Sequence, residues 1–389
     1  MTFNNLGLIK PLLEAINALG YVQPTPIQLK AIPHALEGKD LLACAQTGTG
    51  KTASFALPIL QRLTNSDSCT LRALILTPTR ELASQIGENF IQYGAHLNIT
   101  SAVIFGGISQ KTQTRILAKG ADVLIATPGR LLDLINQGFI KLNTIETFVL
   151  DEADRMLDMG FIHDVQRIVS MLPKKRQTLF FSATMPNNIK KLADRILTQP
   201  IRIEVNPVSS TVDKIKQSVF FVEKNKKPAL LTHLLQDPSF SRVLVFTRTK
   251  RDANRVSEIL NKAKIRSAAI HGNKSQQARE TALESIKKGE SRVLVATDIA
   301  ARGIDIDNVT HVFNFDIPNV PESYVHRIGR TARAGTTGVA MGFCSTEEKP
   351  FLIDIERVIQ KKLPIFETPE GLTSGQNEPE RKRYFQRRR

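Results

Sequence analysis

Short, almost uninterrupted apolar runs recur along this chain, and each is followed by a loop and a segment with helical spacing. In the first half these runs are Ala73–Leu76, Ser101–Phe105, Val123–Ala126, Phe148–Leu150 and Thr178–Phe181. A strand that is apolar on both sides must be buried on both sides, as happens in a parallel sheet covered by helices. The pattern therefore predicts an α/β fold with a mainly parallel sheet and helices on both faces.

The second half repeats the alternation. Its apolar runs are Val219–Val222, Val243–Phe246, Ala268–Ile270, Val293–Ala296, Val312–Phe315 and Gly338–Met341. A chain of 389 residues is also longer than one hydrophobic core usually supports. We therefore predict two tandem domains, 1–205 and 213–365, joined by a linker at 206–212 within a connector that begins near residue 200. Residues 6–18 are expected to form a helix that stops at Gly20, and the polar, then basic, tail 366–389 is expected to be disordered.

The segment Ala45–Thr52 joins an apolar run, Leu41–Ala43, to a helix-compatible run, Ala53–Leu57. Two glycines let such a turn fold tightly, so that several N–H groups and the helix N-terminus face one anion. Lys51 would reach the outer phosphates, and the hydroxyl of Thr52 would reach a magnesium ion. The first position of the pattern is usually glycine and is alanine here. The segment predicts a site for a nucleoside triphosphate with Mg²⁺.

Further polar motifs follow the other predicted strands: Pro78–Leu82, Gly106–Gly107, Thr127–Arg130, Asp151–Asp154 and Ser182–Thr184. Ligands of parallel sheets bind at the carboxyl ends of the strands, so we expect these motifs at one edge. Asp151 would be a second holder of Mg²⁺, and Glu152 would orient or deprotonate a water molecule. The alternative for this pair is a solvated acidic loop.

Two other segments carry side chains suited to a nucleotide. The prolines of Gly20–Gln28 stiffen a turn that presents the ring of Tyr21 and the side-chain amide of Gln28. The ring could stack on the face of a base, and the amide could form hydrogen bonds with its edge. The alternative is a rigid loop that caps the next helix. Arg327, Arg330 and Arg333 recur every three residues and could share a helix face directed at a γ-phosphate. The alternative there is a solvated or nucleic-acid-binding basic helix. Asp305 could accept a hydrogen bond from a ribose hydroxyl.

Composition narrows the class of protein. The net charge of +16 favours a polyanionic partner such as nucleic acid. No apolar run approaches the roughly 20 residues that span a bilayer, and the first five residues lack the features of a secretory signal. Cys44, Cys69 and Cys344 are scattered without metal-ligand spacing, which favours buried thiols in a reducing compartment. We therefore expect a cytoplasmic protein with no membrane association.

Taken together and in order, the motifs resemble those of the DEAD-box ATP-dependent RNA helicases. The resemblance covers residues 3 to about 360 and rests on Ala45–Thr52, Pro78–Ala83, Asp151–Asp154, Ser182–Thr184, Ala296–Asp305 and His326–Arg333. Phe3 and Gly20–Gln28 look like that family's adenine-recognition motif. The string His271–Gln276 and the basic tail look most like the bacterial RhlE-type subgroup. Ala332 stands where the family often has glycine, and the flanking arginines are retained.

The resemblance implies two RecA-like domains that close over ATP and single-stranded RNA. Nucleotide contacts would come from Phe3, Tyr21, Gln28, Ala45, Gln46, Thr47, Gly48, Thr49, Gly50, Lys51, Thr52 and Asp305, with Thr52 and Asp151 holding Mg²⁺. Catalysis would involve Lys51, Asp151, Glu152, His326, Arg330 and Arg333, and Asp154, Ser182 and Thr184 would couple the domains. RNA would lie on Pro78, Thr79, Arg80, Gly107, Thr127, Gly129 and Arg130, then on Arg248, Gly272, Arg279 and Thr297.

The expected activity is that of an RNA-dependent ATPase that opens short duplexes locally and without sequence preference, because contacts to phosphate and sugar do not specify sequence. Arg381–Arg389, interleaved with Tyr384 and Phe385, would add an RNA-binding arm; the alternative is a solubilising terminus. Two other classes remain open: a DNA translocase or helicase, and a non-catalytic RNA-binding or annealing protein. A monomer is expected, with ribosome-assembly or RNA-decay factors as possible partners.

Overall fold

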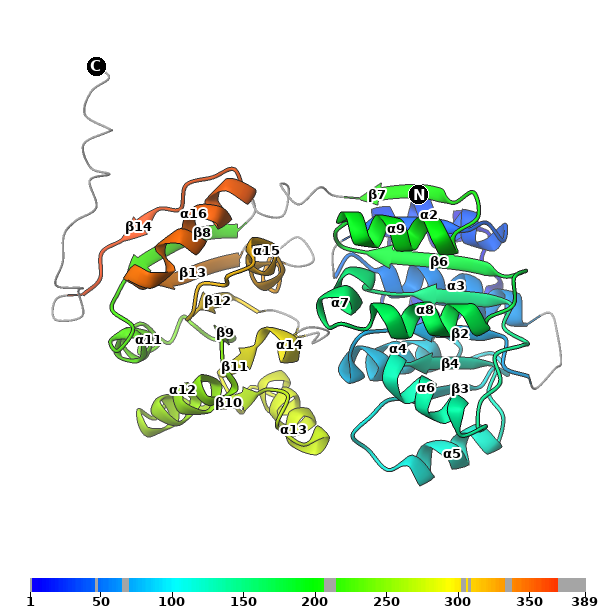
Figure 1. Ribbon diagram of the computed structural model, residues 1–389, viewed down its shortest axis with the longest axis horizontal. Coiled ribbons are helices and arrows are strands. Elements are labelled where there is room, and N and C mark those ends of the chain that lie inside the picture. The colour runs from blue at the N-terminus through cyan, green and yellow to red at the C-terminus, as the bar shows by residue number, and fades with distance from the viewer. Residues whose placement is uncertain are drawn as a thin grey trace, which may run out of the picture. The chain divides into compact units, whose positions relative to one another are not determined.

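The computed structural model describes residues 2–45, 48–64, 70–205, 215–301, 306, 309–332 and 338–369. These residues separate into two compact units, one that runs to residue 205 and one that starts at residue 215 (Figure 1). The predicted linker 206–212 and the tail from residue 370 lie outside the described residues. No helix within the described ranges is long and apolar enough to cross a membrane.

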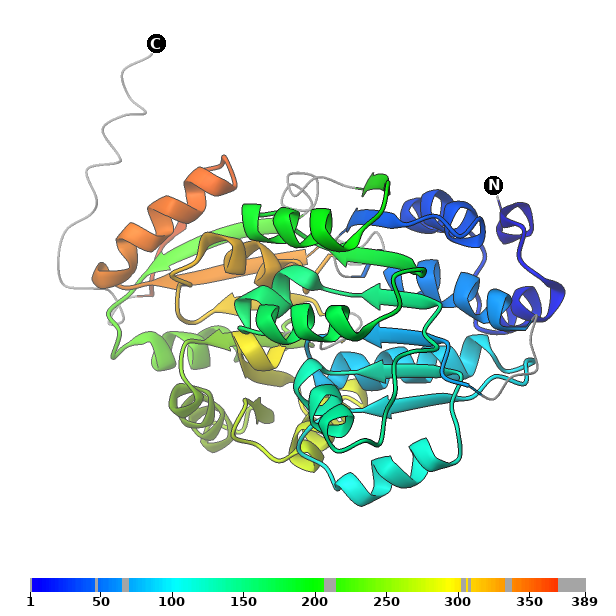
Figure 2. The same cartoon turned by 45° about the vertical axis from the view of Figure 1, so that its right-hand side comes forward.

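The first unit is built on a seven-stranded sheet with the order β3-β4-β2-β5-β6-β1-β7. Its strands are β1 (Leu41–Ala45), β2 (Ala73–Leu76), β3 (Ser101–Ile104), β4 (Val123–Ala126), β5 (Thr147–Leu150), β6 (Gln177–Ser182) and β7 (Ile201–Val205). Its helices are η1 (Phe3–Leu6), α1 (Lys10–Ala18), α2 (Pro26–Leu36), α3 (Lys51–Leu63), α4 (Arg80–Tyr93), α5 (Gln110–Ala118), α6 (Pro128–Asn136), α7 (Ala153–Asp158), α8 (Ile162–Met171) and α9 (Asn187–Ile196). All pairings between these strands are parallel, as the arrows in Figure 2 show.

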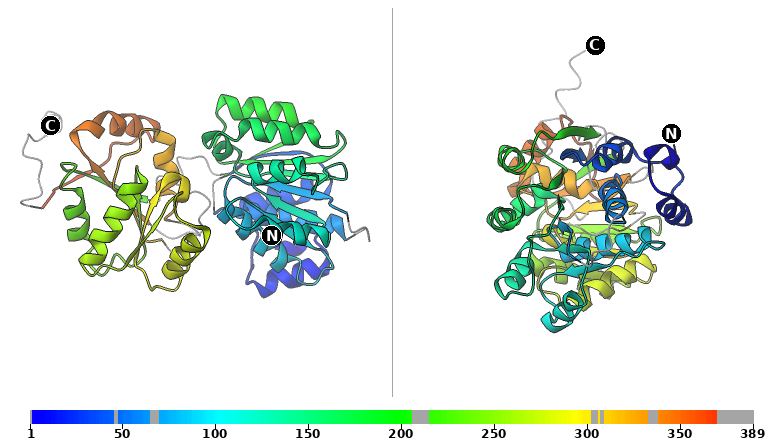
Figure 3. Two further views of the ribbon diagram at one scale, coloured as in Figure 1. Left: turned by 60° about the horizontal axis from the view of Figure 1, so that its bottom comes forward. Right: turned by 90° about the vertical axis from the view of Figure 1, so that its right-hand side faces the viewer.

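Alternate residues of strands β1 to β6 face different hydrophobic cores. Leu41 and Ala43 of β1 pack with helices α1 to α4, whereas Leu42 packs with helices α6 to α9 on the other face. Successive side chains of a strand point to opposite faces, so a strand between two helix layers must be apolar throughout. Figure 3 shows the sheet between its two helix layers. This arrangement confirms the α/β prediction and explains the uninterrupted apolar runs.

The second unit repeats the architecture with the order β10-β11-β9-β12-β13-β8-β14, again with parallel pairings. Its strands are β8 (Ile215–Phe221), β9 (Val243–Thr247), β10 (Ser267–Ile270), β11 (Val293–Thr297), β12 (His311–Asn314), β13 (Gly338–Cys344) and β14 (Ile365–Phe366). Its helices are α11 (Lys227–Leu234), α12 (Lys250–Lys262), α13 (Gln276–Lys287), α14 (Asp298–Ala301), α15 (Pro321–Ile328), η2 (Thr346–Glu348) and α16 (Lys349–Val358).

Three expectations about local structure are wrong. The supposed connector from residue 200 begins with β7, which pairs with β1 at the edge of the sheet. The supposed helix over 6–18 is interrupted, since Gly7 adopts a φ of +76° after η1 and α1 begins only at Lys10. The tail does not start at residue 366, because Phe366 belongs to β14 and the hydroxyl of Thr368 donates to the carbonyl of Phe221 at 3.0 Å.

The cysteines behave as expected where they are described. Cys44 is half-buried and Cys344 is buried, both as free thiols, and burial raises the pKa of each. Cys69 lies outside the described residues. Thiols of raised pKa are poor nucleophiles at neutral pH, and both thiols donate to nearby backbone carbonyls at 3.4 Å.

Candidate functional site

The predicted site residues of the first unit follow the carboxyl ends of neighbouring strands. In sheet order, Gly107 follows β3, the segment from Thr127 follows β4 and the segment from Pro78 follows β2. The segment from Asp151 follows β5, Ser182 ends β6, and the phosphate loop follows β1. The expected RNA contacts therefore occupy three adjacent strands, and the expected catalytic, domain-coupling and phosphate-binding residues occupy the next three.

The phosphate loop is held by contacts from within the first unit. Gly50 adopts a φ of +91° just before α3, and a Cβ added there would lie 2.5 Å from the amide nitrogen of Gln28. That nitrogen donates to the carbonyl of Gly50 at 3.1 Å, and the amide oxygen accepts from the backbone N–H of Thr25 at 2.9 Å. The buried Lys51 donates through Nζ to the carbonyl of Ala45 at 3.0 Å. Gln28 therefore holds the backbone at Gly50, and its second N–H and second lone pair remain chemically able to meet a base.

An aromatic cluster lies beside the proline-stiffened turn. The ring of Tyr21 is 6.2 Å from that of Phe3 and 6.0 Å from that of Tyr93, and the two tyrosine hydroxyls are 2.9 Å apart. Phe3 and Tyr93 are buried, whereas Tyr21 is half-buried. The cluster gives Tyr21 a fixed ring plane next to the turn that carries Gln28.

Two carboxylates lie at the end of β5. Asp151 is 2% exposed, and burial raises its pKa to about 6 while the positive charge of Lys51 opposes that shift. Glu152 adopts a left-handed conformation with a φ of +54°, and its Oε2 accepts from Nη1 of the buried Arg155 at 2.6 Å. The backbone therefore turns sharply at Glu152, and Arg155 fixes the orientation of that carboxylate. This ion pair is unlike the solvated acidic loop that was the alternative.

The end of β5 is tied to the end of β6. Oδ2 of Asp154 accepts from both the N–H and the hydroxyl of Thr184, each at 2.9 Å. The hydroxyl of Ser182 accepts from the N–H of Asp154 at 3.3 Å and donates to the carbonyl of Thr184 at 2.7 Å. Each of the three residues contacts the other two, so these hydrogen bonds hold the ends of β5 and β6 together.

The turn after β3 has a close neighbour in the first residue of α4. Gly107 has a φ of +86°, and a Cβ added there would overlap the guanidinium of Arg80. Just before this turn, the buried amide of Gln113 accepts from the N–H of Phe105 at 3.0 Å and donates to its carbonyl at 3.1 Å. The amide thus replaces a strand partner at the point where β3 ends, and it fixes where the turn starts.

Helix N-termini and cations complete this part of the edge. Thr79 caps α4 by accepting from the N–H of Leu82 at 3.3 Å, and Thr127 is the N-cap residue of α6. Within the part of the chain that the structure describes, no neighbouring atom lies within 4 Å of a Cβ added at Gly129. Arg130 pairs with Asp133 at 3.5 Å, yet its buried Nη1 has no hydrogen-bond partner among the described residues. Helix N-termini and a guanidinium with an unused donor are suited to a phosphate.

In the second unit the predicted RNA contacts again follow three adjacent strands. Gly272 follows β10, Thr297 ends β11 and Arg248 follows β9, and these strands are neighbours in the order β10-β11-β9. Arg279 lies on α13, which packs on β10 and β11. The segment with the predicted finger arginines follows the next strand, β12.

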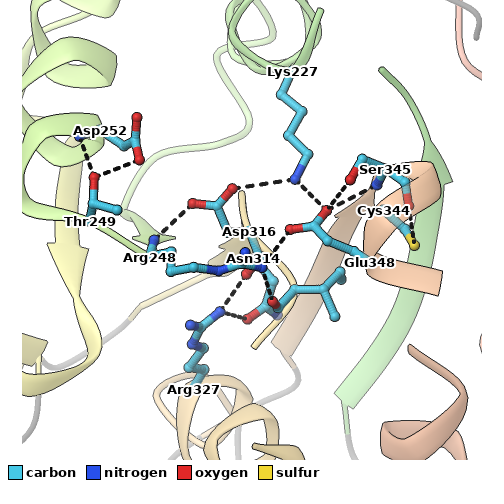
Figure 4. A network of polar contacts seen from close by, with 11 residues as sticks. Lys227, Arg248, Thr249, Asp252, Asn314, Asp316, Arg327, Cys344, Ser345 and Glu348 are labelled. Atoms are coloured by element: carbon cyan, nitrogen blue, oxygen red, sulfur yellow. Dashed lines mark hydrogen bonds and ion pairs between the residues drawn. The ribbon is translucent and has the colours of Figure 1, made fainter. Parts of the chain in front are cut away.

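The idea that three arginines share one helix face is wrong. Helix α15 ends at Ile328, so Arg330 lies beyond it, where its Nε donates to the carbonyl of His326 at 3.3 Å. Arg327 is 3% exposed and is held inside the unit: two of its nitrogens donate to the carboxylate of Asp298 at 2.5 and 2.7 Å. Its Nη1 donates to the Oδ1 of Asn314 at 3.0 Å, at the lower end of the network in Figure 4. Arg327 is therefore a packing residue of this unit.

Four predicted site residues lie outside the described residues: the nucleotide contacts Gln46, Thr47 and Asp305, and the catalytic candidate Arg333. Conversely, three partners were missed by sequence reasoning: Arg155, Gln113 and Asp298. Arg155 stands three residues after Glu152 at the start of a helix, which is a readable signal for an ion pair. Gln113 contacts Phe105 and Asp298 contacts Arg327 only because of how the chain folds, and neither contact follows a sequence spacing that predicts it.

Comparisons with known proteins agree with this geometry. The DEAD/DEAH box helicase family matches residues 25–192, and the helicase conserved C-terminal domain matches residues 226–335. The DEAD-box ATP-dependent RNA helicase CshA of Bacillus cereus is 46% identical over 95% of this chain and 70% of its own length. CshA of Bacillus subtilis is 45% identical over 95% of this chain and 74% of its own length.

Solved structures give the same result. Dbp5 of S. cerevisiae, bound to RNA and ADP BeF3, has a TM-score of 0.86 and 33% identity over 95% of this chain and 96% of that chain. Mss116p, bound to ssRNA and AMP-PNP, has a TM-score of 0.87 and 31% identity over 96% of this chain and 81% of that chain. The sheets, their edge motifs and these similarities place the chain in the DEAD-box family of ATP-dependent RNA helicases, as an enzyme of two RecA-like domains.

Proposed function

We propose that this protein is an RNA-dependent ATPase that opens short RNA duplexes locally when ATP draws its two domains onto a single strand. The observation that carries the proposal is the arrangement along the first sheet, where nucleotide and RNA candidates occupy adjacent sets of strand ends. Dbp5 and Mss116p, its structural relatives, each bind RNA together with a nucleotide analogue.

The nucleotide would be held mainly by the first unit. Backbone N–H groups of the loop Ala45–Thr52 and the side chain of Lys51 would bind its phosphates. Gln28 would read the adenine edge, Tyr21 would stack on its face with Phe3 behind it, and Asp305 would contact the ribose. The fixed Tyr21 ring and the dual bonding of Gln28 support this role, because both side chains are oriented before any ligand arrives.

The residues present fit a magnesium ion. Mg²⁺ prefers oxygen ligands and is commonly held by one or two carboxylates together with substrate phosphates. Asp151 and Thr52 offer a carboxylate and a hydroxyl; burial raises the pKa of Asp151, and a bound cation would favour its ionised form. When bound, the ion would neutralise charge on the phosphates.

Hydrolysis would depend on Glu152, which would orient or deprotonate the attacking water. Its carboxylate is fixed by Arg155, so little reorganisation is needed when a water arrives. Arg330 and Arg333 would supply positive charge to the γ-phosphate, and His326 would help join the domains. Asp154, Ser182 and Thr184 would couple the nucleotide to RNA, since their mutual bonds join the ends of β5 and β6.

RNA would lie along Pro78, Thr79, Arg80, Gly107, Thr127, Gly129 and Arg130, then along Arg248, Gly272, Arg279 and Thr297. Helix N-termini, glycine turns and guanidinium groups recognise phosphate and sugar, so binding would be largely independent of sequence. Affinity would fall steeply with salt, the more so if the tail up to Arg389 contributes.

We further propose that the first domain is 1–205, that 206–212 is the linker, and that the second domain starts at residue 213 and extends past residue 365, because Phe366 and Thr368 contact the second unit. The basic tail would follow, up to residue 389. The string His271–Gln276 and the basic tail favour a protein of the RhlE-type subgroup. We propose that the protein is cytoplasmic and works as a monomer. Ribosome assembly and RNA decay are the processes in which such a helicase would find partners.

The test compares ATPase stimulation by RNA and by DNA of one sequence, using the intact chain. Strong stimulation by RNA and little by DNA is expected, because 2′-hydroxyl contacts discriminate between them. Equal stimulation would favour a DNA translocase, and no stimulation by either would favour a non-catalytic RNA-binding protein. Deleting 370–389 separates tail-dependent annealing from unwinding by the two domains.

A further inference from the structure

A buried polar network connects the start of α12 to the start of α16 in the second unit (Figure 4). Its centre is Glu348, which is 4% exposed. Oε2 of Glu348 accepts from Nζ of Lys227 at 2.6 Å and from the N–H and hydroxyl of Ser345, each at 3.0 Å. Its other oxygen, Oε1, accepts from Nη2 of Arg248 at 3.0 Å. One buried carboxylate therefore connects a buried lysine to an arginine at the surface.

Arg248 is fixed by further contacts but stays accessible. Its N–H donates to the carboxylate of Asp316 at 2.8 Å, and its Nη2 also donates to the carbonyl of Ile317 at 3.1 Å. The guanidinium carbon lies 5.8 Å from the centre of the Phe351 ring. Even so, 49% of the Arg248 side chain is exposed. Both side-chain bonds leave from one nitrogen, so an incoming phosphate can still meet the exposed part of the guanidinium.

Lys227 supplies a buried positive charge next to the carboxylates of Glu348 and Asp316. It is 1% exposed and lies between Glu348 and Asp316, whose Oδ1 is 3.4 Å from Nζ. A buried carboxylate needs a buried cation, and Lys227 supplies it to Glu348. Arg248 is therefore not the sole counter-ion of Glu348, and the exposed part of its guanidinium remains available to a polyanion.

We propose that Glu348 is a positioning residue for RNA binding, which holds the guanidinium of Arg248 ready for an RNA phosphate. The inference rests on the RNA contact proposed above for Arg248. A long side chain that is free in solution loses rotamer freedom when it binds, and a side chain that is already oriented loses less. Glu348 lies beyond the recognised motifs, 100 residues from Arg248.

The experiment measures binding of a fluorescent single-stranded decauridylate by anisotropy with a non-hydrolysable ATP analogue, and the RNA concentration for half-maximal ATPase activity. The variants are Arg248→Ala, Glu348→Ala and the double variant. Each single variant is expected to weaken RNA binding roughly five- to tenfold, with turnover at saturating RNA almost unchanged. The double variant is expected to be no weaker than Arg248→Ala, because Glu348 acts through that side chain.

Glu356→Ala is the matched control. Glu356 is also 4% exposed in α16, and it accepts from the N–H of Leu363 at 3.0 Å and from Lys362 at 2.9 Å, away from Arg248. The Glu356→Ala variant should have a lower melting temperature than the unmodified protein and the same RNA affinity. Glu348→Gln is a second variant, to be used if Glu348→Ala fails to fold, because glutamine keeps a hydrogen-bond acceptor for Arg248. It is expected to weaken RNA binding roughly twofold, since a neutral acceptor holds a guanidinium less firmly than a carboxylate does.

Two results would overturn the inference: full RNA affinity in the folded Glu348 variants, or losses that simply add in the double variant. In both cases a weakened Arg248→Ala would leave the proposed RNA contact standing. Full affinity in Arg248→Ala would instead remove the proposed contact itself, so the two failures are distinguishable.

Discussion

The hydroxyls of Tyr21 and Tyr93 lie 2.9 Å apart, which joins the proline-stiffened turn to the last residue of α4. The first residue of that helix is Arg80, whose guanidinium packs against Gly107. One helix therefore has a candidate RNA contact at its start and the partner of a candidate adenine contact at its end. A rigid element of this kind can make the binding of one ligand sensitive to the other.

Replacing Tyr93 with phenylalanine removes one hydroxyl and leaves the packing intact. We expect the ATP concentration for half-maximal ATPase activity to rise roughly two- to fivefold, because one hydrogen bond that orients Tyr21 is lost. Steady-state kinetics at saturating RNA measure this. Tyr324→Phe is the matched control, since its buried hydroxyl donates to Gln217 in the second unit at 3.0 Å. Equal changes in both variants would mean that the hydroxyl of Tyr93 only stabilises the fold.

Glu152→Gln should reduce RNA-stimulated turnover by roughly 10²–10⁴-fold, the usual contribution of a general base. Binding of ATP and RNA should be retained, because the amide still fills the space beside Arg155. Single-turnover hydrolysis and equilibrium binding separate these effects. The exposed Glu88, changed to glutamine, serves as the control. Turnover close to that of the unmodified protein would assign the water-activating role to another group.

Gln113→Ala removes the amide that takes the place of a strand partner for Phe105. The N–H and carbonyl of Phe105 then lose their partner while buried, so we expect a loss of about 1–3 kcal/mol in the free energy of unfolding. RNA affinity should also fall, since the turn at Gly107 is no longer fixed at its start. Urea unfolding and anisotropy measure the two effects. The exposed Gln137, changed to alanine, should show neither, and unchanged RNA affinity in a folded Gln113→Ala would contradict the link to the turn.

The stability of the second unit should fall as the pH drops through about 6.5, the ordinary pKa of histidine. Burial, and then the positive charges of Lys274, Lys250 and Arg279, lower the pKa of His271 in the folded protein. The unfolded chain therefore takes up a proton first, so stability is present at neutral pH and is lost on acidification. Its Nδ1 accepts from the N–H of Asn273 at 3.3 Å, which fits the neutral ring.

Urea midpoints at pH 7.5 and 5.5, followed by circular dichroism, measure this effect. His271→Gln should show a smaller difference between the two midpoints than the unmodified protein. His233→Gln, which changes an exposed histidine of the same unit, should keep the full difference. A His271→Gln variant with the full pH dependence would assign the effect to other groups.

Most strands could be predicted because burial on both faces leaves an apolar run that is visible in sequence. β7 was missed because it is an edge strand, in which Arg202 and Glu204 alternate with buried residues. A run that is apolar on only one face does not stand out from a polar connector. The motif residues could be placed on the sheet edge because each follows a recognisable strand.

The interactions within the site were less predictable. A spacing of three residues suggested a common face for Arg327 and Arg330, but that holds only while a helix continues, and α15 ends between them. Sequence reasoning also gave no sign of Glu348, which meets Lys227 from 121 positions away. Contacts of this kind depend on how strands and helices pack, and one sequence contains no local pattern for them.

The pairing of the edge strand β7 with β1 has a mechanical consequence. Val205 is the register partner of Ala45, whose carbonyl accepts from Lys51. The polypeptide thus leaves the first unit alongside the residue where the phosphate loop begins. Tension applied to the chain at Val205 would act on the β1–β7 ladder, and strain would reach the position of Lys51 without any ligand as intermediary.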